Sequence, residues 1–183
     1  MKNLVTLIIK NQRQLNFKVD DVENYNDFSN LKVNYHFKNT EVELFDDFLI
    51  EGIRTFERVL QRCLNGKMIL PQKYFERGIG YEWNIISNNI AEGDFSIENV
   101  NDPFLLWDAN PNVGLATWMY NCKGQTYFEV SQEYKYNYSE PDENFVPFQV
   151  FLENYEIVDR IAIDKEMLLQ WYKEVKKILD SLK

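Results

Sequence analysis

The chain has 183 residues, 45% of them hydrophobic and 15% aromatic, and its net charge is −9. This length and composition predict a single domain over residues 1–183 with a substantial core. The acidic balance disfavours nucleic acid and anionic membranes as partners, because phosphate groups are bound by clustered Lys and Arg. No segment approaches the ~20 apolar residues of a membrane span, and the first residues do not resemble a signal peptide, so a cytoplasmic protein is expected.

The first half of the chain is predicted to form a small sheet followed by a helix. Alternating apolar and polar residues predict strands at 4–8, 15–19 and 31–37. Apolar residues at helical spacing predict an amphipathic helix over about 47–65. Gly52 lies on its apolar stripe and allows a close approach to a sheet, while Gly66 suits the end of the helix.

The second half is predicted to continue as strands and to close with a helix. Apolar residues at a period of two predict strands at 81–85, 95–97, 104–106, 113–119, 128–138 and 148–152. Their connections are too short for helical crossovers, which indicates an antiparallel meander. A stripe from Leu168 to Leu182, after an N-cap at Asp164, predicts the last helix. The expected fold class is α+β, with an antiparallel β-meander sheet and two main amphipathic helices packed on it.

Several common chemistries have no support in the sequence. His36 is the only imidazole and occupies a polar strand position, so it is expected at the surface rather than in catalysis. Cys63 and Cys122 are expected to be free thiols. One His and two isolated Cys do not make a zinc site, and no glycine-rich phosphate loop is present. No metal, cofactor or catalytic residue is therefore predicted.

Two patterns of charged residues are expected to be structural features rather than functional sites. Glu129 and Glu133 fall on one face of the 128–138 strand and are expected to be solvated, although a catalytic carboxylate pair is the alternative. Arg54, Arg58 and Arg62 recur every four residues of the first helix. They are expected to pair with carboxylates of the same chain, with a grip on an acidic ligand as the alternative.

The strongest functional signal is the segment from Gly78 to Cys122, which contains no Lys or Arg. Carboxylates attract a cationic partner and an exposed Trp supplies a binding anchor. The residues predicted to contact a partner are Glu92, Asp94, Glu98, Asp102, Trp107 and Asp108. The alternative is that Trp83, Trp107 and Trp118 are core residues and the acids ordinary surface.

The end of the chain reads Ile161-x-Ile163-x-Lys165-Glu166-x-Leu168-Leu169-x-Trp171-Tyr172. With its small size, acidity and aromatic richness, this layout resembles small bacterial immunity-type proteins, which neutralise a toxin encoded beside them. The resemblance implies a non-enzymatic protein that occludes a basic partner such as a nuclease-like toxin. Two other hypotheses remain open. One is a carboxylate-based enzyme or small-ligand binder with a pocket of Tyr134, Tyr136, Trp118 and Glu133, and the other is a module that forms a homodimer through an aromatic sheet face.

Overall fold

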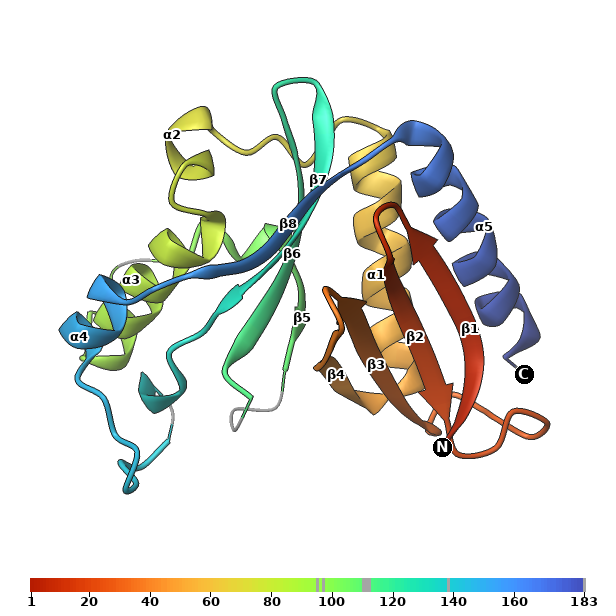
Figure 1. Ribbon diagram of the computed structural model, residues 1–183, viewed down its shortest axis with the longest axis horizontal. Coiled ribbons are helices and arrows are strands. Elements are labelled where there is room, and N and C mark those ends of the chain that lie inside the picture. The colour runs from red at the N-terminus through yellow and green to blue at the C-terminus, as the bar shows by residue number, and fades with distance from the viewer. Residues whose placement is uncertain (95, 97, 110–112, 138, 183) are drawn as a thin grey trace.

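The computed structural model describes residues 1–94, 96, 98–109, 113–137 and 139–182 (Figure 1). Its strands are β1 (Lys2–Ile9), β2 (Arg13–Val19), β3 (Asn30–Phe37), β4 (Thr40–Phe48), β5 (Leu105–Asp108), β6 (Leu115–Cys122), β7 (Gln125–Gln132) and β8 (Ile157–Ile163). Its α-helices are α1 (Leu49–Leu64), α2 (Gln72–Phe75), α3 (Ile79–Ala91), α4 (Phe148–Glu153) and α5 (Lys165–Ser181), and 3-10 turns span Asp102–Phe104 and Lys135–Asn137. None of these described helices is long and apolar enough to cross a membrane.

The strands form two antiparallel sheets, each of four strands in chain order, β1-β2-β3-β4 and β5-β6-β7-β8. Turns of two or three residues connect β1 to β2, β3 to β4 and β6 to β7, and in the β3–β4 hairpin Lys38 and Asn39 have φ of 48° and 65°. Since every pairing between the named strands is antiparallel and the helices lie on the sheet faces, the α+β prediction is confirmed, with two sheets in place of one (Figure 1).

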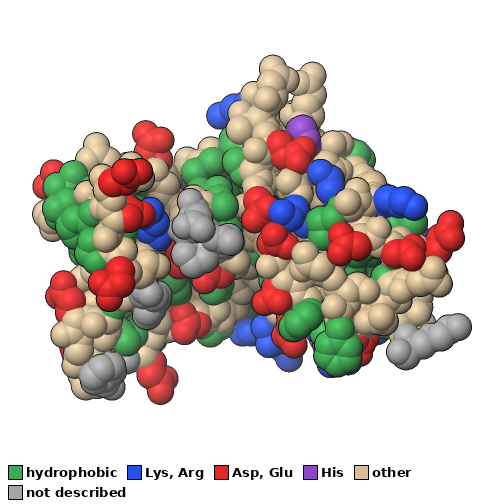
Figure 2. Space-filling view, turned by 90° about the horizontal axis from the view of Figure 1, so that it is seen from below, with side chains coloured by type: hydrophobic (Ala, Val, Ile, Leu, Met, Phe, Trp, Pro, Cys, Tyr) green, Lys and Arg blue, Asp and Glu red, His purple; other side chains and the backbone are tan. Residues whose placement is uncertain are grey.

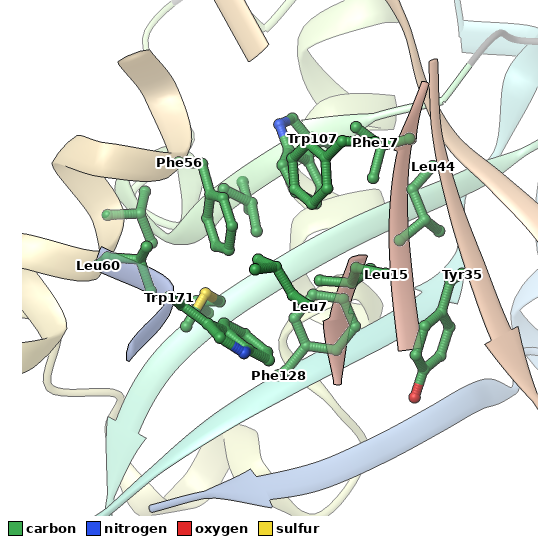
Figure 3. Packing of buried hydrophobic residues seen from close by; sticks show 14 of the residues in the cluster. Leu7, Leu15, Phe17, Tyr35, Leu44, Phe56, Leu60, Trp107, Phe128 and Trp171 are labelled. Atoms are coloured by element: carbon green, nitrogen blue, oxygen red, sulfur yellow. The ribbon is translucent and has the colours of Figure 1, made fainter. Parts of the chain in front are cut away.

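The larger core joins the two sheets through α1 and α5. It contains apolar residues of β1–β4, of both helices and of one face of β5–β8. Aromatic rings meet there from distant parts of the chain, as Figure 3 shows for Phe56, Trp107, Phe128 and Trp171. Both helices predicted from the sequence are therefore packed as expected, because their apolar stripes face this core.

A smaller core covers the opposite face of the second sheet, under α2 and α3. Its buried members include Ile79, Trp83, Trp118 and Tyr120. The strand β6 is consequently buried on both faces, which explains its nearly continuous apolar run.

The predicted strand at 81–85 is wrong, because these residues belong to α3. The helix buries residues at helical spacing, but half of them are polar: Ile79, Gly80, Trp83, Asn84, Ser87 and Asn88. Asn84 is satisfied inside the protein, with its amide donating to the carbonyl of Gly80 (2.7 Å) and accepting from the N–H of Tyr134 (2.7 Å). Because half of the buried residues are polar, the apolar residues of this segment alone do not show helical spacing.

Three further boundaries differ from the expectations. Residues 148–152 form helix α4, in which Phe148 and Phe151 both pack on Tyr134, with ring centroids 5.0 and 5.2 Å apart. The strand expected at 128–138 ends at Gln132, and the bond from Tyr134 to Asn84 turns the chain away. Strand β4 has no predicted counterpart, and its last two residues lie within the helix predicted over 47–65. The predicted strand at 95–97 includes residues 95 and 97, which lie outside the described residues.

Candidate functional site

Five of the six residues predicted to contact a partner lie at the surface. Glu92 follows α3, Asp102 lies in a 3-10 turn and Asp108 ends β5, and all five acidic residues are exposed: Glu92, Asp94, Glu98, Asp102 and Asp108. None of the five forms an ion pair within 4.0 Å with a described Lys, Arg or His. Their charge is therefore not balanced by neighbouring cations and is available to a cationic partner.

The sixth residue, Trp107, is not a surface anchor. Its side chain is 2% exposed, packs between Phe17 and Phe56, and donates its indole N–H to the carbonyl of Gly52 (3.2 Å). Trp83 and Trp118 are also buried. The prediction of a tryptophan anchor is thus corrected: all three indoles of this segment stabilise the cores.

An acidic cleft lies where β4 meets the second sheet. It encloses about 370 Å³ and is lined by Asp46 and Asp47 from β4, Asp108 from β5 and Glu133 beyond β7. Figure 2 views the molecule from below. It shows Asp and Glu side chains both on the half that carries β1–β4 and on the half that carries α3 and α4. Lys135 also lines the cleft, but its ammonium pairs with Asp142 (2.9 Å).

Glu133 and Asp108 form a carboxyl pair within the cleft. Burial and the hydrogen-bonded carboxyl of Asp108 raise the pKa of Glu133 to about 9. At neutral pH Glu133 is therefore a neutral acid that can donate a hydrogen bond. Asp108 ends β5 and Glu133 directly follows β7, so the two residues are brought together by the strand order β5-β6-β7.

A second hollow of about 250 Å³ shares Glu133 with Tyr134 and Tyr136. Three of the four residues suggested for an aromatic pocket therefore do lie together. Trp118 does not belong to this hollow, because it is fully buried under α3 and donates its indole N–H to Ser131 (2.9 Å).

Glu129 is not on a solvated strand face, as had been expected, but is completely buried. One oxygen, Oε2, accepts hydrogen bonds from Nε of Arg160 (2.7 Å) and from the hydroxyl of Tyr120 (2.5 Å). Burial raises the pKa of Glu129, although Arg160 and Tyr120 act in the opposite direction. Glu129 is completely buried and lines neither the cleft nor the second hollow, so the two carboxyls do not face a common pocket.

The remaining candidates from the sequence are the arginine row of α1, His36 and the two cysteines. Arg54 and Arg58 are exposed and Arg62 is half-buried, and none pairs with a described carboxylate within 4.0 Å, so the expected pairing of this row is wrong. His36 lies at the surface and contacts Glu41, as its strand position predicted. Both Cys63 and Cys122 are free thiols. Among the residues described, no group of His, Cys, Asp or Glu could hold a metal ion.

Comparison with known proteins does not assign the chain to a family. No protein-family model matches the sequence, and neither the curated proteins nor the solved structures that were compared contain a match.

Proposed function

We propose that this protein is a non-enzymatic acidic binding module whose partner is a basic protein, such as a nuclease-like toxin neutralised by occlusion. The observation that carries the proposal is the set of exposed acidic residues from Glu92 to Asp108, none of which forms an ion pair with a described cation, together with the acidic cleft that Asp108 lines. Such a surface attracts a cationic partner over a distance and repels acidic ones. Blocking the active site of a nuclease requires the same complementarity, because that site is built to hold phosphate groups.

Binding through this surface should weaken as salt rises, because exposed charges are screened within about 8 Å at physiological ionic strength. The experiment is a pull-down from lysate of the source organism with the tagged protein, eluted in steps of salt. A triple variant, Glu92→Gln, Asp94→Asn and Glu98→Gln, should bind the captured protein about tenfold more weakly, since each rim charge contributes about 0.5 kcal/mol.

The matched control removes the same charge elsewhere, with Glu140→Gln, Glu143→Gln and Glu153→Gln, which are also exposed. This variant should keep the affinity of the wild type. Equal weakening by both triple variants would indicate an effect of net charge alone, and an interaction indifferent to salt would exclude the electrostatic mechanism.

A second candidate function, a small-ligand binder, is favoured by the hollow that Glu133, Tyr134 and Tyr136 share. A neutral carboxyl beside two phenol rings suits a ligand with a hydrogen-bond acceptor and an apolar body. Thermal-shift screening of a small-molecule library would detect such a ligand. Loss of the shift in Glu133→Ala, with the fold intact, would place it in this hollow.

A further inference from the structure

Two phenylalanine rings are exposed side by side at the junction of β4 and α1. Phe28 is 76% exposed and Phe48 is 49% exposed, and their rings meet edge to face with centroids 6.0 Å apart. An isolated exposed apolar side chain is common, but a packed aromatic pair in solvent is typical of an interaction site.

The loop that carries Phe28 is held in place. The side chain of Asn26 accepts from the N–H of Phe28 (2.9 Å), and the backbone of Asn26 bonds to both the N–H and the hydroxyl of Ser29 (3.0 and 2.9 Å). The first residue of α1, Leu49, donates its N–H to the carbonyl of Ser29 (2.8 Å). The ring is therefore presented by an ordered turn, and binding to it loses little conformational entropy.

The surroundings of the pair are acidic. Phe48 directly follows Asp46 and Asp47, which line the cleft, and Asp27 directly precedes Phe28. Asp46 pairs with Lys32 (3.0 Å), whereas Asp47 is exposed and has no ion pair with a described cation. Aromatic faces also attract cations, so rings and carboxylates favour the same kind of ligand. The exposed basic row of α1 begins only further along the helix, at Arg54.

We infer that the Phe28–Phe48 pair and the acidic cleft beside it form one docking surface for a basic segment of a partner protein, in which an apolar side chain lies between Arg or Lys residues. The apolar side chain packs on the two rings and the cations face Asp47 and the cleft. This inference rests on the proposed function and supplies the anchor that the buried Trp107 cannot. A second copy of the chain fits this surface poorly, because two molecules of net charge −9 would bring like charges together.

The test uses three synthetic peptides of equal length, with alternating Arg and Leu, Arg and Ser, or Glu and Leu. Titrations followed by NMR should show that the Arg–Leu peptide binds most tightly and shifts the amide signals of residues 26–29 and 46–48. Phe28→Ser should lower the affinity for this peptide at least tenfold while the spectrum stays dispersed. Ile69→Ser removes an apolar side chain that is 70% exposed elsewhere and should leave the affinity unchanged.

Equal binding of the Arg–Leu and Arg–Ser peptides, or equal binding by the wild type and Phe28→Ser, would overturn the aromatic anchor. If the triple variant of Glu92, Asp94 and Glu98 still weakened binding in that case, the proposed function would stand without it. Light scattering tests the other possible occupant of this surface, a second copy of the chain. A dimer of the wild type that dissociates in Phe28→Ser would identify a second copy on this surface and would also overturn the inference.

Discussion

Glu129 is buried and Glu133, four residues further on, is half-buried, and their neighbours decide the protonation state of each carboxyl. Glu129 is fully buried but has a guanidinium and a phenol within hydrogen-bond distance. Glu133 is paired with another carboxyl, that of Asp108, so burial and its partner both raise its pKa. Arg160 and Tyr120 thus compensate a negative charge on Glu129, whereas Asp108 favours the protonated form of Glu133.

We predict that Glu133 makes the protein less stable as pH rises. Its pKa increases from 4.5 to about 9 on folding, so between these values the folded chain holds a proton that the unfolded chain releases. Its stabilising effect is therefore complete below about pH 4.5 and is lost as pH rises towards 9. Glu133→Gln, which is always neutral, should raise the free energy of unfolding at pH 8 by about 1–3 kcal/mol and flatten its pH dependence.

Urea unfolding of both proteins at pH 5, 7 and 8.5 measures this difference. Glu140→Gln, a substitution of the same kind at an exposed site, is the control and should change little at any pH. Parallel pH profiles for the wild type and Glu133→Gln would show that the carboxyl is not held protonated by the fold.

The sequence predicts which acidic residues are exposed, but not which residues from distant segments they contact. The absence of Lys and Arg between Gly78 and Cys122 is visible in the sequence, and it does predict surface carboxylates that form no ion pair with a described cation. The burial of Trp107, the pairing of Asp108 with Glu133 and the contact of Phe28 with Phe48 depend on packing between distant segments. No local pattern could have indicated them, because each joins residues from different elements.

At the scale of elements, those with a strong apolar stripe were predicted well. The predicted helices, at 47–65 and from 165 to 182, agree with α1 and α5 to within two residues at both ends. Residues 81–85 and 148–152 were predicted as strands from only three alternating apolar residues, a pattern that a short helix also produces. Tertiary contacts of Asn84 and Phe151 then decide in favour of the helix.

Gly52 determines how closely α1 approaches the first sheet. A Cβ atom there would lie 2.6 Å from the ring of Phe45 and 2.8 Å from Cδ2 of Leu31, which is completely buried. Gly52→Ala should therefore lower the free energy of unfolding by about 1–3 kcal/mol through overpacking. This is opposite to the gain of about 1 kcal/mol expected from helix propensity alone.

Urea unfolding gives the sign of this change directly. Gln61→Ala, at an exposed position of the same helix, is the control for propensity and should fall within about 0.5 kcal/mol of the wild type. A more stable Gly52→Ala would mean that the sheet can move away from the helix, so that Gly52 is not required for close packing.

At the scale of the whole molecule, the two sheets are tied together by polar and apolar contacts. Arg13 of β2 donates to both carboxylate oxygens of Asp159 in β8 (2.7 and 2.8 Å), and the hydroxyl of Tyr35 in β3 donates to the same carboxylate (2.5 Å). Beside them, Phe128 of β7 contacts Tyr35 and Trp171, with centroids 5.4 and 6.3 Å apart (Figure 3). The first sheet, the second sheet and α5 thus share one cluster of side chains.

This shared cluster leads to the prediction that both sheets unfold together, as expected of a single domain. Phe128→Ala should lower the free energy of unfolding by about 3–5 kcal/mol, and hydrogen exchange should show the same loss of protection in β2 and in β6. Phe75→Ala tests the smaller core, where Phe75 packs on Tyr120 and Tyr127, and in one cooperative unit its loss of stability should also lower protection equally in β2 and in β6. Loss of protection confined to β5–β8 in Phe128→Ala would show that the sheets unfold independently and that the chain contains two cooperative units.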